Sequence, residues 1–381
     1  MNGNRTGPWL VCIAVAAVIT PTARPVPVTI TYTDAAGHGF QDPTLGPVRR
    51  ACIEAAAANW ANRLSGTVPV RIQASMIAMG ALPGGGAILG GARANYLVHD
   101  FAPGVLNNVF YAAAQANQIA GSDLYSTEDD IIIQYNSDID PPSLVLAPAR
   151  FNYATDGKLS LSSGYYNFDF YQTCLHELGH GLGFFSTLNP DGSYFTTSFP
   201  YPMIYDTFLA TGPGVNPPLL TSLTQTQRST ALVSNALYWA GANARAAAGN
   251  TNPRIFAPNP YQGGSSVSHL NESSYPGTIL HANINELMTP NLGPGVTHYP
   301  GPIVSGVFED IGWNFQPYTV SDATTALKDY AGLLPASEGD LVRVHRYGLT
   351  TYPGHISLQD VVAVIRAAAG TATNPYILGT P

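Results

Sequence analysis

The chain has 381 residues, a net charge of −8 at pH 7 and only 10% charged residues, against about 25% in an average soluble protein. It contains 38 glycines and 31 prolines, so many long loops are expected. Its lysines are Lys158 and Lys328 alone, and no basic cluster occurs, which argues against nucleic acid or an anionic membrane as a partner. The length allows one large domain and a small one.

The N-terminal residues have the pattern of a secretory signal. Arg5 precedes an apolar run over residues 9–19, and cleavage is expected near residues 20–25. The run is too short for a stable membrane anchor, and no later stretch approaches the roughly 18 apolar residues that a spanning helix needs. We therefore expect residues 1–23 to be a signal peptide and the mature protein to be secreted.

Alternation and helical spacing predict the first elements of the mature chain. Residues 26–33 alternate as a strand, a helix begins near Pro47, and residues 68–76 form a second strand. The face of the helix that is expected to be buried carries Val48, Cys52, Ala56 and Trp60.

The next part of the chain is less regular. The glycine-rich stretch 80–91 lacks the lysine of a phosphate-binding loop and indicates a flexible segment. Residues 92–99 are compatible with an edge strand, and residues 105–119 with a helix. The continuous apolar run in residues 130–135 predicts a strand that is buried on both faces.

Residues 173–184 predict a helix with a His-Glu-x-x-His motif. His176 and His180 are four residues apart, so on a helix they share one face, about 5–6 Å apart at Cβ, and can bind one ion. Glu177 lies one step round the helix, where its carboxylate can meet a water molecule bound to the metal. The alternative is a core helix with two buried, hydrogen-bonded histidines.

The motif extends to Gly183, and the sequence Asn-Glu-Leu-Met-Thr-Pro around Met288 is similar to the methionine turn of the metzincin zinc peptidases. A typical metzincin has its third ligand three residues after this glycine, but Ser186 stands there. The chain instead resembles the leishmanolysin branch, as found in bacterial secreted proteins, in which an insertion precedes a later Ser-His pair. Here that pair ends at His269.

The resemblance covers residues 26–315 and implies an α/β (α+β) zincin fold. Such a fold has a mixed, twisted sheet with two long helices, one of which carries the motif, above a lower subdomain with the methionine turn. The resemblance also implies one catalytic Zn²⁺ ion, held by His176, His180 and His269, with Glu177 as the general base.

Elimination also favours His269 as the third ligand. Between Gly181 and Asn271 the sequence has no glutamate and no other histidine. The later rivals are His281, which lacks a Ser-His context, and His298, which we expect at the surface.

The insertion, residues 187–264, gives no catalytic signal of its own. Its Asp191 and Asp206 could be oxygen ligands, bind calcium or cap turns, and turn capping is the preferred interpretation. A helix is expected within residues 224–234, and a closing helix over residues 302–311.

Two cysteines remain after the signal, Cys52 and Cys174. An oxidising compartment allows them to form one disulfide, and the alternative is two buried thiols. Since both lie on apolar faces of expected helices, a bond would tie the first long helix to the motif helix.

The last segment repeats itself at an offset of 38 residues. Capping patterns at residues 319–322 and 357–360 each open an amphipathic helix. The pair resembles a dockerin module. However, Leu349, Thr351 and Pro353 stand where acidic ligands belong, so calcium is not expected, and a cohesin-type partner stays an option.

These boundaries divide the chain into a signal peptide (1–23), a metzincin-like catalytic domain (24–316) and a dockerin-like helical pair (317–381). We expect a secreted zinc-dependent endopeptidase that cleaves protein or peptide substrates by means of a metal-activated water molecule, with Glu177 as general base. The alternative from another class is a catalytically silent zincin-fold protein that binds or adheres, although the intact Glu177 argues against it. A metallohydrolase that cleaves another kind of bond also fits the motif.

Overall fold

The computed structural model describes residues 24–155, 160–195, 200–276, 283, 285–292, 300–316, 318–333 and 358–369. The expected signal peptide, His281, His298 and the loop before the second helix of the repeat lie outside these residues.

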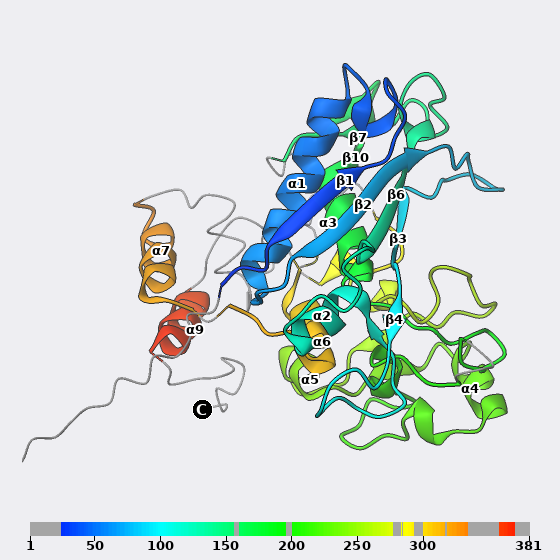
Figure 1. The fold of residues 1–381 in the computed structure, drawn as a ribbon, viewed down its shortest axis with the longest axis vertical. Helices are drawn as coiled ribbons and strands as arrows, with labels where there is room; N and C mark the ends of the chain where they lie inside the picture. Colours follow the sequence, from blue (N-terminus) through cyan, green and yellow to red (C-terminus); the bar gives the residue numbers. More distant parts are fainter. Residues whose placement is uncertain are drawn as a thin grey trace, which may run out of the picture.

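A four-stranded mixed sheet forms the upper half of the molecule (Figure 1). Its strands are β1 (Val28–Tyr32), β2 (Val70–Ile77), β6 (Ile131–Asn136) and β3 (Gly90–Ala94), in the order β1-β2-β6-β3. The first three strands are parallel, whereas β3 runs antiparallel to β6 at the edge of the sheet. The sequence left undecided whether residues 92–99 form an edge strand. The structure has an edge strand here, β3, which begins two residues earlier and ends at Ala94.

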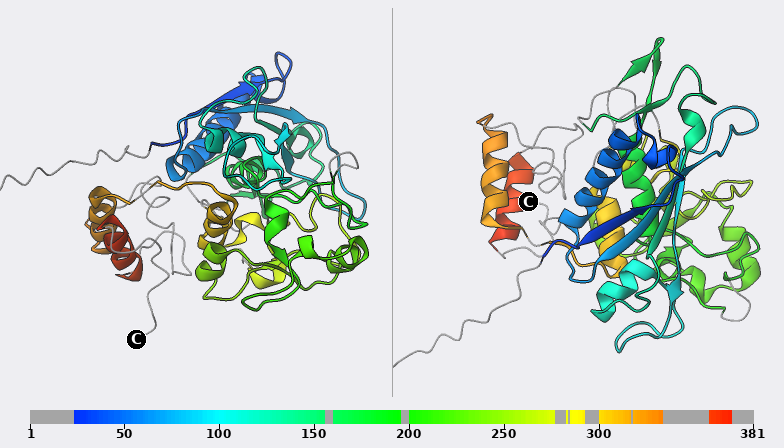
Figure 2. Two further views of the ribbon diagram at one scale, coloured as in Figure 1. Left: turned by 60° about the horizontal axis from the view of Figure 1, so that its bottom comes forward. Right: turned by 45° about the horizontal axis from the view of Figure 1, so that its top comes forward.

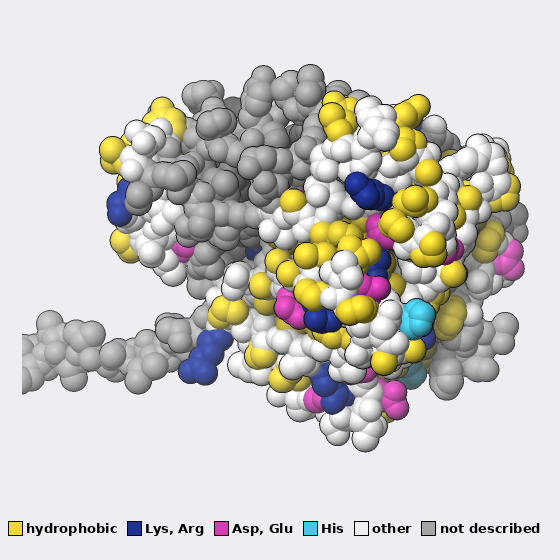
Figure 3. All heavy atoms as spheres, turned by 90° about the horizontal axis from the view of Figure 1, so that it is seen from above, with side chains coloured by type: hydrophobic (Ala, Val, Ile, Leu, Met, Phe, Trp, Pro, Cys, Tyr) yellow, Lys and Arg dark blue, Asp and Glu magenta, His cyan; other side chains and the backbone are white. Residues whose placement is uncertain are grey.

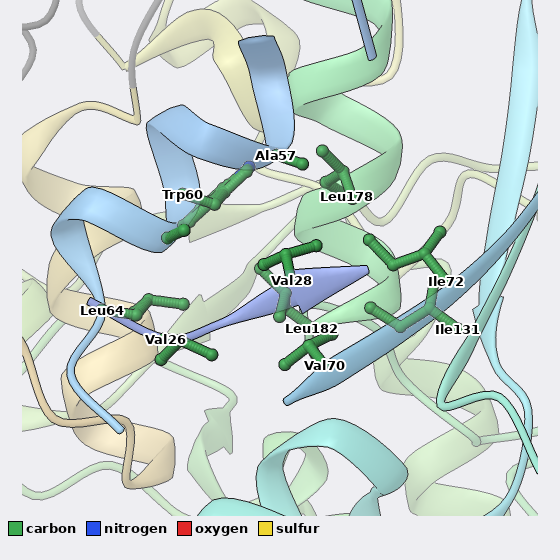
Figure 4. Close-up of a pocket in the computed structure, with 11 residues that line it drawn as sticks. Val26, Val28, Ala57, Trp60, Leu64, Val70, Ile72, Ile131, Leu178 and Leu182 are labelled. Carbon is green, nitrogen blue, oxygen red and sulfur yellow. The ribbon is translucent and has the colours of Figure 1, made fainter. Parts of the chain in front are cut away.

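Two long helices, α1 (Gly46–Arg63) and α3 (Phe170–Gly181), pack side by side against this sheet. Side chains from α1, α3, β1, β2 and β6 point toward one another in Figure 4 and enclose a cavity of only about 10 Å³. Trp60 lines this space, and its indole N–H donates a hydrogen bond to the carbonyl of Leu175 on α3 (3.0 Å). This apolar layer fixes the position of α3 relative to the sheet.

The structure corrects three of the sequence expectations. Val48 is 42% exposed, while Cys52, Ala56 and Trp60 of the same predicted stripe are buried. Strand β6 is buried on one face only, because Ile132 lies between Gln73 and Arg93 on the half-exposed outer face. Of residues 105–119, only the part from Ala113 onward is helical, and residues 105–112 are loop and strand.

The lower half is built from short elements joined by loops (Figures 1 and 2). Its helices are α2 (Ala113–Ala120), α4 (Gln225–Ala231), α5 (Ala242–Ala247) and α6 (Pro302–Ile311), and its strands are β4 (Leu97–Val98), β5 (Tyr111–Ala112), β11 (Leu209–Ala210), β12 (Leu237–Trp239) and β13 (Arg254–Ile255). Apart from these elements of the lower half, the other short strands of the described residues are β7 (Phe151–Asn152), β8 (Leu161–Ser162), β9 (Tyr165–Tyr166) and β10 (Phe168–Asp169). Helix α4 lies within the expected range and is capped by Thr224, and α6 has the expected limits.

The two helices of the repeat, α7 (Val320–Tyr330) and α9 (Leu358–Ala368), lie side by side and apart from the sheet (Figure 2). They share a small hydrophobic cluster of their own, which includes Ala326, Val361 and Val364. At the start of α7, Asp322 accepts hydrogen bonds from the N–H and hydroxyl of Thr319, so the capping pattern is present.

The described residues thus form a mixed α/β structure of the α+β kind. Among them, no helix is both long and apolar enough to span a bilayer. On the face drawn in Figure 3, acidic and basic side chains lie singly among apolar and polar ones rather than in a patch of one sign.

Candidate metal centre

Helix α3 is completely buried and carries the motif. It begins after Asp169, whose carboxylate accepts a hydrogen bond from the N–H of Gln172 (2.8 Å), while the Thr173 hydroxyl donates to the Asp169 carbonyl (2.9 Å). This side-chain cap satisfies backbone donors in the buried first turn of the helix.

Two glycines let α3 approach its neighbours more closely than other residues would. A Cβ atom at Gly179 would lie 2.7 Å from the sulfur of Met288, and one at Gly181 would lie 2.3 Å from Ile131 on β6. Sequence reasoning missed both contacts, although a glycine inside a helix costs about 1 kcal/mol relative to alanine and therefore signals a packing constraint.

The structure brings together the three expected histidines, His176 and His180 on α3 and His269 from beyond the insertion. Their Nε2 atoms form a nearly equilateral triangle, with separations of 3.1 Å (His176 to His180), 3.1 Å (His180 to His269) and 3.2 Å (His269 to His176). All three side chains are buried, and they lie close enough together to bind one metal ion.

The other ring nitrogen of each histidine faces a backbone carbonyl. The Nδ1 atoms of His176, His180 and His269 lie 2.6, 2.7 and 2.8 Å from carbonyl oxygens of Leu287, Phe184 and Ser265, respectively. Because a carbonyl can only accept, each Nδ1 carries the proton and each Nε2 is left with a lone pair. Three lone pairs thus converge without a proton between them.

Burial keeps these imidazoles neutral. Desolvation lowers the pKa of His176 to about 4, and desolvation together with the neighbouring His176 lowers the pKa of His180 to about 3. The pKa of His269 is well below its ordinary value, first through burial and then through His180 and His176. Neutral imidazole is the form that binds metal ions.

The geometry fits a cation at the centre of the triangle. Ligand atoms of a tetrahedral site with metal–nitrogen distances of about 2.0–2.1 Å are about 3.3 Å apart, close to the separations observed here. Without a cation the three lone pairs would only repel one another. The convergence of three acceptors is therefore compatible with a bound metal ion.

Glu177 is buried beside this cluster and contacts the edge strand β3. The backbone N–H of Ala92 donates a hydrogen bond to its carboxylate, and burial, which outweighs that bond, raises the pKa of Glu177 to about 8. A Cβ atom at Gly90 would lie 3.2 Å from the Glu177 Cγ, so the strand runs directly along this side chain.

The turn that contains Met288 and the end of α3 complete the surroundings of the histidines. Met288 is buried in a short 3-10 helix (Glu286–Met288), and its carbonyl accepts a hydrogen bond from the N–H of Leu270 (2.8 Å). Gly183 has a φ of +121°, a left-handed conformation that turns the chain so that the Phe184 carbonyl reaches His180. These two residues hold the backbone partners of the imidazoles in place.

The disulfide that was one of two options for Cys52 and Cys174 is not formed, because both are buried free thiols. Each sulfur has another partner: Cys52 donates to the Tyr153 carbonyl (3.0 Å), and Cys174 interacts with the hydroxyl of Tyr135. Burial raises the pKa of Cys52 to about 12, so its thiol is inert at neutral pH.

The two aspartates of the insertion are separate from the metal centre. Asp191 is exposed and caps a turn through the N–H and hydroxyl of Ser193 (2.9 and 2.6 Å). Asp206 is buried and its oxygens accept hydrogen bonds from Ser186, Thr187 and Met203. Turn capping, the preferred interpretation, describes Asp191, whereas Asp206 caps the turn at Met203 and also ties it to Ser186 and Thr187.

Comparison of this chain with protein families, with curated proteins and with solved structures found no match.

Proposed function

We propose that the protein is a secreted zinc-dependent endopeptidase of metzincin type, with a leishmanolysin-like arrangement of its third ligand. The observation that carries the proposal is the convergence of three neutral imidazoles, two of them from one helix turn, beside the buried Glu177 of the same turn. Three imidazoles suit zinc among the divalent ions and leave a fourth position for water or substrate.

In this proposal His176, His180 and His269 hold the ion. A zinc ion held there would supply a bound water molecule with a pKa near 7 and would polarise the scissile carbonyl. The carboxylate of Glu177 takes a proton from the attacking water and later gives it to the leaving amine. Burial alone would keep this carboxyl group protonated at neutral pH, and the positive charge of a bound ion would favour the carboxylate form that accepts the proton.

The Nδ1 protons orient the ligands. Each of these protons is held by a backbone carbonyl, which fixes the plane of the ring and leaves the Nε2 lone pair free to bind the ion. The turn that contains Met288 supports the same arrangement, because it contributes the Leu287 carbonyl to His176.

The test is zinc content together with cleavage of casein, an unstructured protein, by wild type, Glu177→Gln and His269→Ala. We expect wild type to bind one zinc ion and cleave casein, Glu177→Gln to retain zinc and lose cleavage by at least about 100-fold, and His269→Ala to lose both. His38→Ala is the matched control, because His38 is exposed and should change neither property.

Other outcomes separate the alternatives. Zinc binding without casein cleavage in wild type would favour the silent binding protein, or a metallohydrolase with another substrate. Absence of zinc from wild type purified without chelator, and no uptake on titration, would reject the metal centre. The helical pair 317–381 and its cohesin-type partner are part of the proposal only as an accessory module.

A further inference from the structure

His269 is presented by a backbone turn that its own sequence disfavours. Val267, two residues before it, has a φ of +72°, in the left-handed region that a β-branched residue rarely adopts. Val267 is also fully buried, with its N–H donating to the Phe256 carbonyl (2.7 Å). A conformation of this kind persists only where the surroundings enforce it, and such residues concentrate at functional sites.

The insertion supplies a direct tie to this turn. Tyr205, at the start of a short 3-10 helix (Tyr205–Phe208), donates a hydrogen bond from its hydroxyl to the carbonyl of Val267 (3.1 Å). Tyr205 is fully buried and packs against Phe184 and Trp239, with ring centroids 5.3 and 4.7 Å apart. The ring is therefore fixed, and its hydroxyl holds the strained residue from one side.

A second tie passes through Ser186. Its N–H donates to the Ser268 hydroxyl (3.1 Å), and its own hydroxyl donates to Asp206 (2.6 Å), the residue next to Tyr205. Asp206 also accepts from the Thr187 hydroxyl (2.9 Å) and the Met203 N–H (3.0 Å). Ser186, which stands where a typical metzincin has its ligand, thus connects the end of the α3 turn to the residue before His269.

We propose that the 3-10 helix Tyr205–Phe208 is the element that positions the third metal ligand. Tyr205 acts directly on Val267, and Asp206 acts through Ser186 on Ser268, so that the imidazole of His269 meets those of α3. These are positioning residues, because none of them contacts the metal position. The inference rests on the proposed zinc site and gives the insertion a role that its sequence did not indicate.

The experiment measures zinc affinity by competition with a chromophoric chelator, for full-length wild type, Tyr205→Phe and Ser268→Ala. Each substitution removes one hydroxyl tie and keeps the packing. Loss of a group that orients a metal ligand typically costs 10–100-fold in metal affinity, and we expect a loss in this range for each variant. The visible absorption of the cobalt-substituted protein should also lose intensity, because a loosened His269 distorts the tetrahedral site.

Tyr111→Phe is the matched control. Tyr111 is buried, and its hydroxyl accepts a hydrogen bond from the backbone N–H of Leu106 (3.1 Å), a contact that none of the metal-binding histidines shares. It should bind zinc and cobalt as wild type does. Thermal unfolding of the metal-free proteins should place all three variants within a few degrees of one another, which shows that the affinity loss is not a loss of folding.

Wild-type zinc affinity and an unchanged cobalt spectrum in Tyr205→Phe and Ser268→Ala would overturn the inference while leaving the zinc site intact. An equal loss of affinity in Tyr111→Phe would also overturn it, since the effect would then be general. If wild type itself binds no zinc, the proposed function fails, and this outcome is distinct from the other two.

Discussion

The contact between Gly179 and Met288 provides a sharp test of how the metal centre is supported. In Gly179→Ala the new methyl group would lie 2.7 Å from the Met288 sulfur, 3.1 Å from its terminal carbon and 3.5 Å from Trp60. Comfortable carbon contacts lie at about 3.5–4.0 Å, so the methionine side chain must move by about 1 Å. Met288 is fully buried, which leaves little room for that movement.

Two effects of opposite sign decide the magnitude. Alanine is favoured over glycine in a helix interior by about 1 kcal/mol, whereas an extra methyl in a packed core typically costs about 1–3 kcal/mol. We therefore expect Gly179→Ala to lower the free energy of unfolding by up to about 2 kcal/mol. Metal affinity should fall more clearly, because Met288 is tied through Leu287 to His176 and through Leu270 to the chain beside His269.

The assay is a double-mutant cycle with Gly179→Ala, Met288→Ala and the double variant, measured by chemical denaturation of the metal-free proteins and by zinc titration. Met288→Ala alone opens a cavity and should cost about 2–5 kcal/mol, but the methyl group that Gly179→Ala introduces fills part of that space. The double variant should accordingly be more stable than the sum of the single effects predicts, by about 1–2 kcal/mol. Gly214→Ala, where a Cβ would meet no atom closer than 4 Å, is the control. A coupling energy near zero would refute the tight contact between α3 and the turn that contains Met288.

Three further predictions concern acid stability, the cysteines and the helical pair. The pKa of His269 is depressed in the folded state, so below pH 6.5 the unfolded chain binds a proton that the folded chain does not. The free energy of unfolding of metal-free wild type should therefore fall from pH 6.5 to 5 faster than that of His269→Gln, by up to about 1.4 kcal/mol per pH unit. Equal dependence of this free energy on pH in the two proteins, measured by urea denaturation, would contradict the prediction. Cys52 and Cys174 should react with a thiol reagent only after unfolding, and a count of no thiols in the unfolded, unreduced protein would show a disulfide. Calcium should leave the melting temperature of full-length protein unchanged, and a rise of several degrees that is lost on deletion of residues 317–381 would mean that this segment binds calcium.

Sequence periodicity predicted the parts of the metal centre that are local. His176, Glu177 and His180 follow from helical spacing alone, because residues four apart on a helix must share a face. The third ligand could also be named, since the sequence offers no other histidine or glutamate over the interval of the insertion. His269 was predictable because few residues in this interval could bind a metal, and not because the sequence carries any geometric signal.

Features that depend on tertiary packing did not follow from the sequence. Val48 has the spacing of the buried stripe but lies in the first turn of α1, where Gly46 and Arg49 are buried and Val48 is exposed. The left-handed turn at Val267 runs against the preference of the residue itself and is imposed by Tyr205 and the Phe256 carbonyl. The roles of Tyr205 and Ser186 depend on which backbone groups approach them from distant segments, and spacing carries no information about that.

The size of the insertion gives a reason why it must be well folded. His180 and His269 are 89 residues apart, and closing a flexible loop of that length costs about 4 kcal/mol of chain entropy, which would directly reduce metal affinity. The insertion instead contributes buried residues such as Trp239 and Leu232 to the same hydrophobic core as α3. Asp310 on α6 fixes it further by accepting hydrogen bonds from the Trp239 indole (2.9 Å) and from the N–H groups of Asn243 and Ala244 (2.8 and 3.1 Å). Folding of the lower half therefore offsets the closure entropy before any ion binds, and it delivers His269 to α3 as a preorganised ligand.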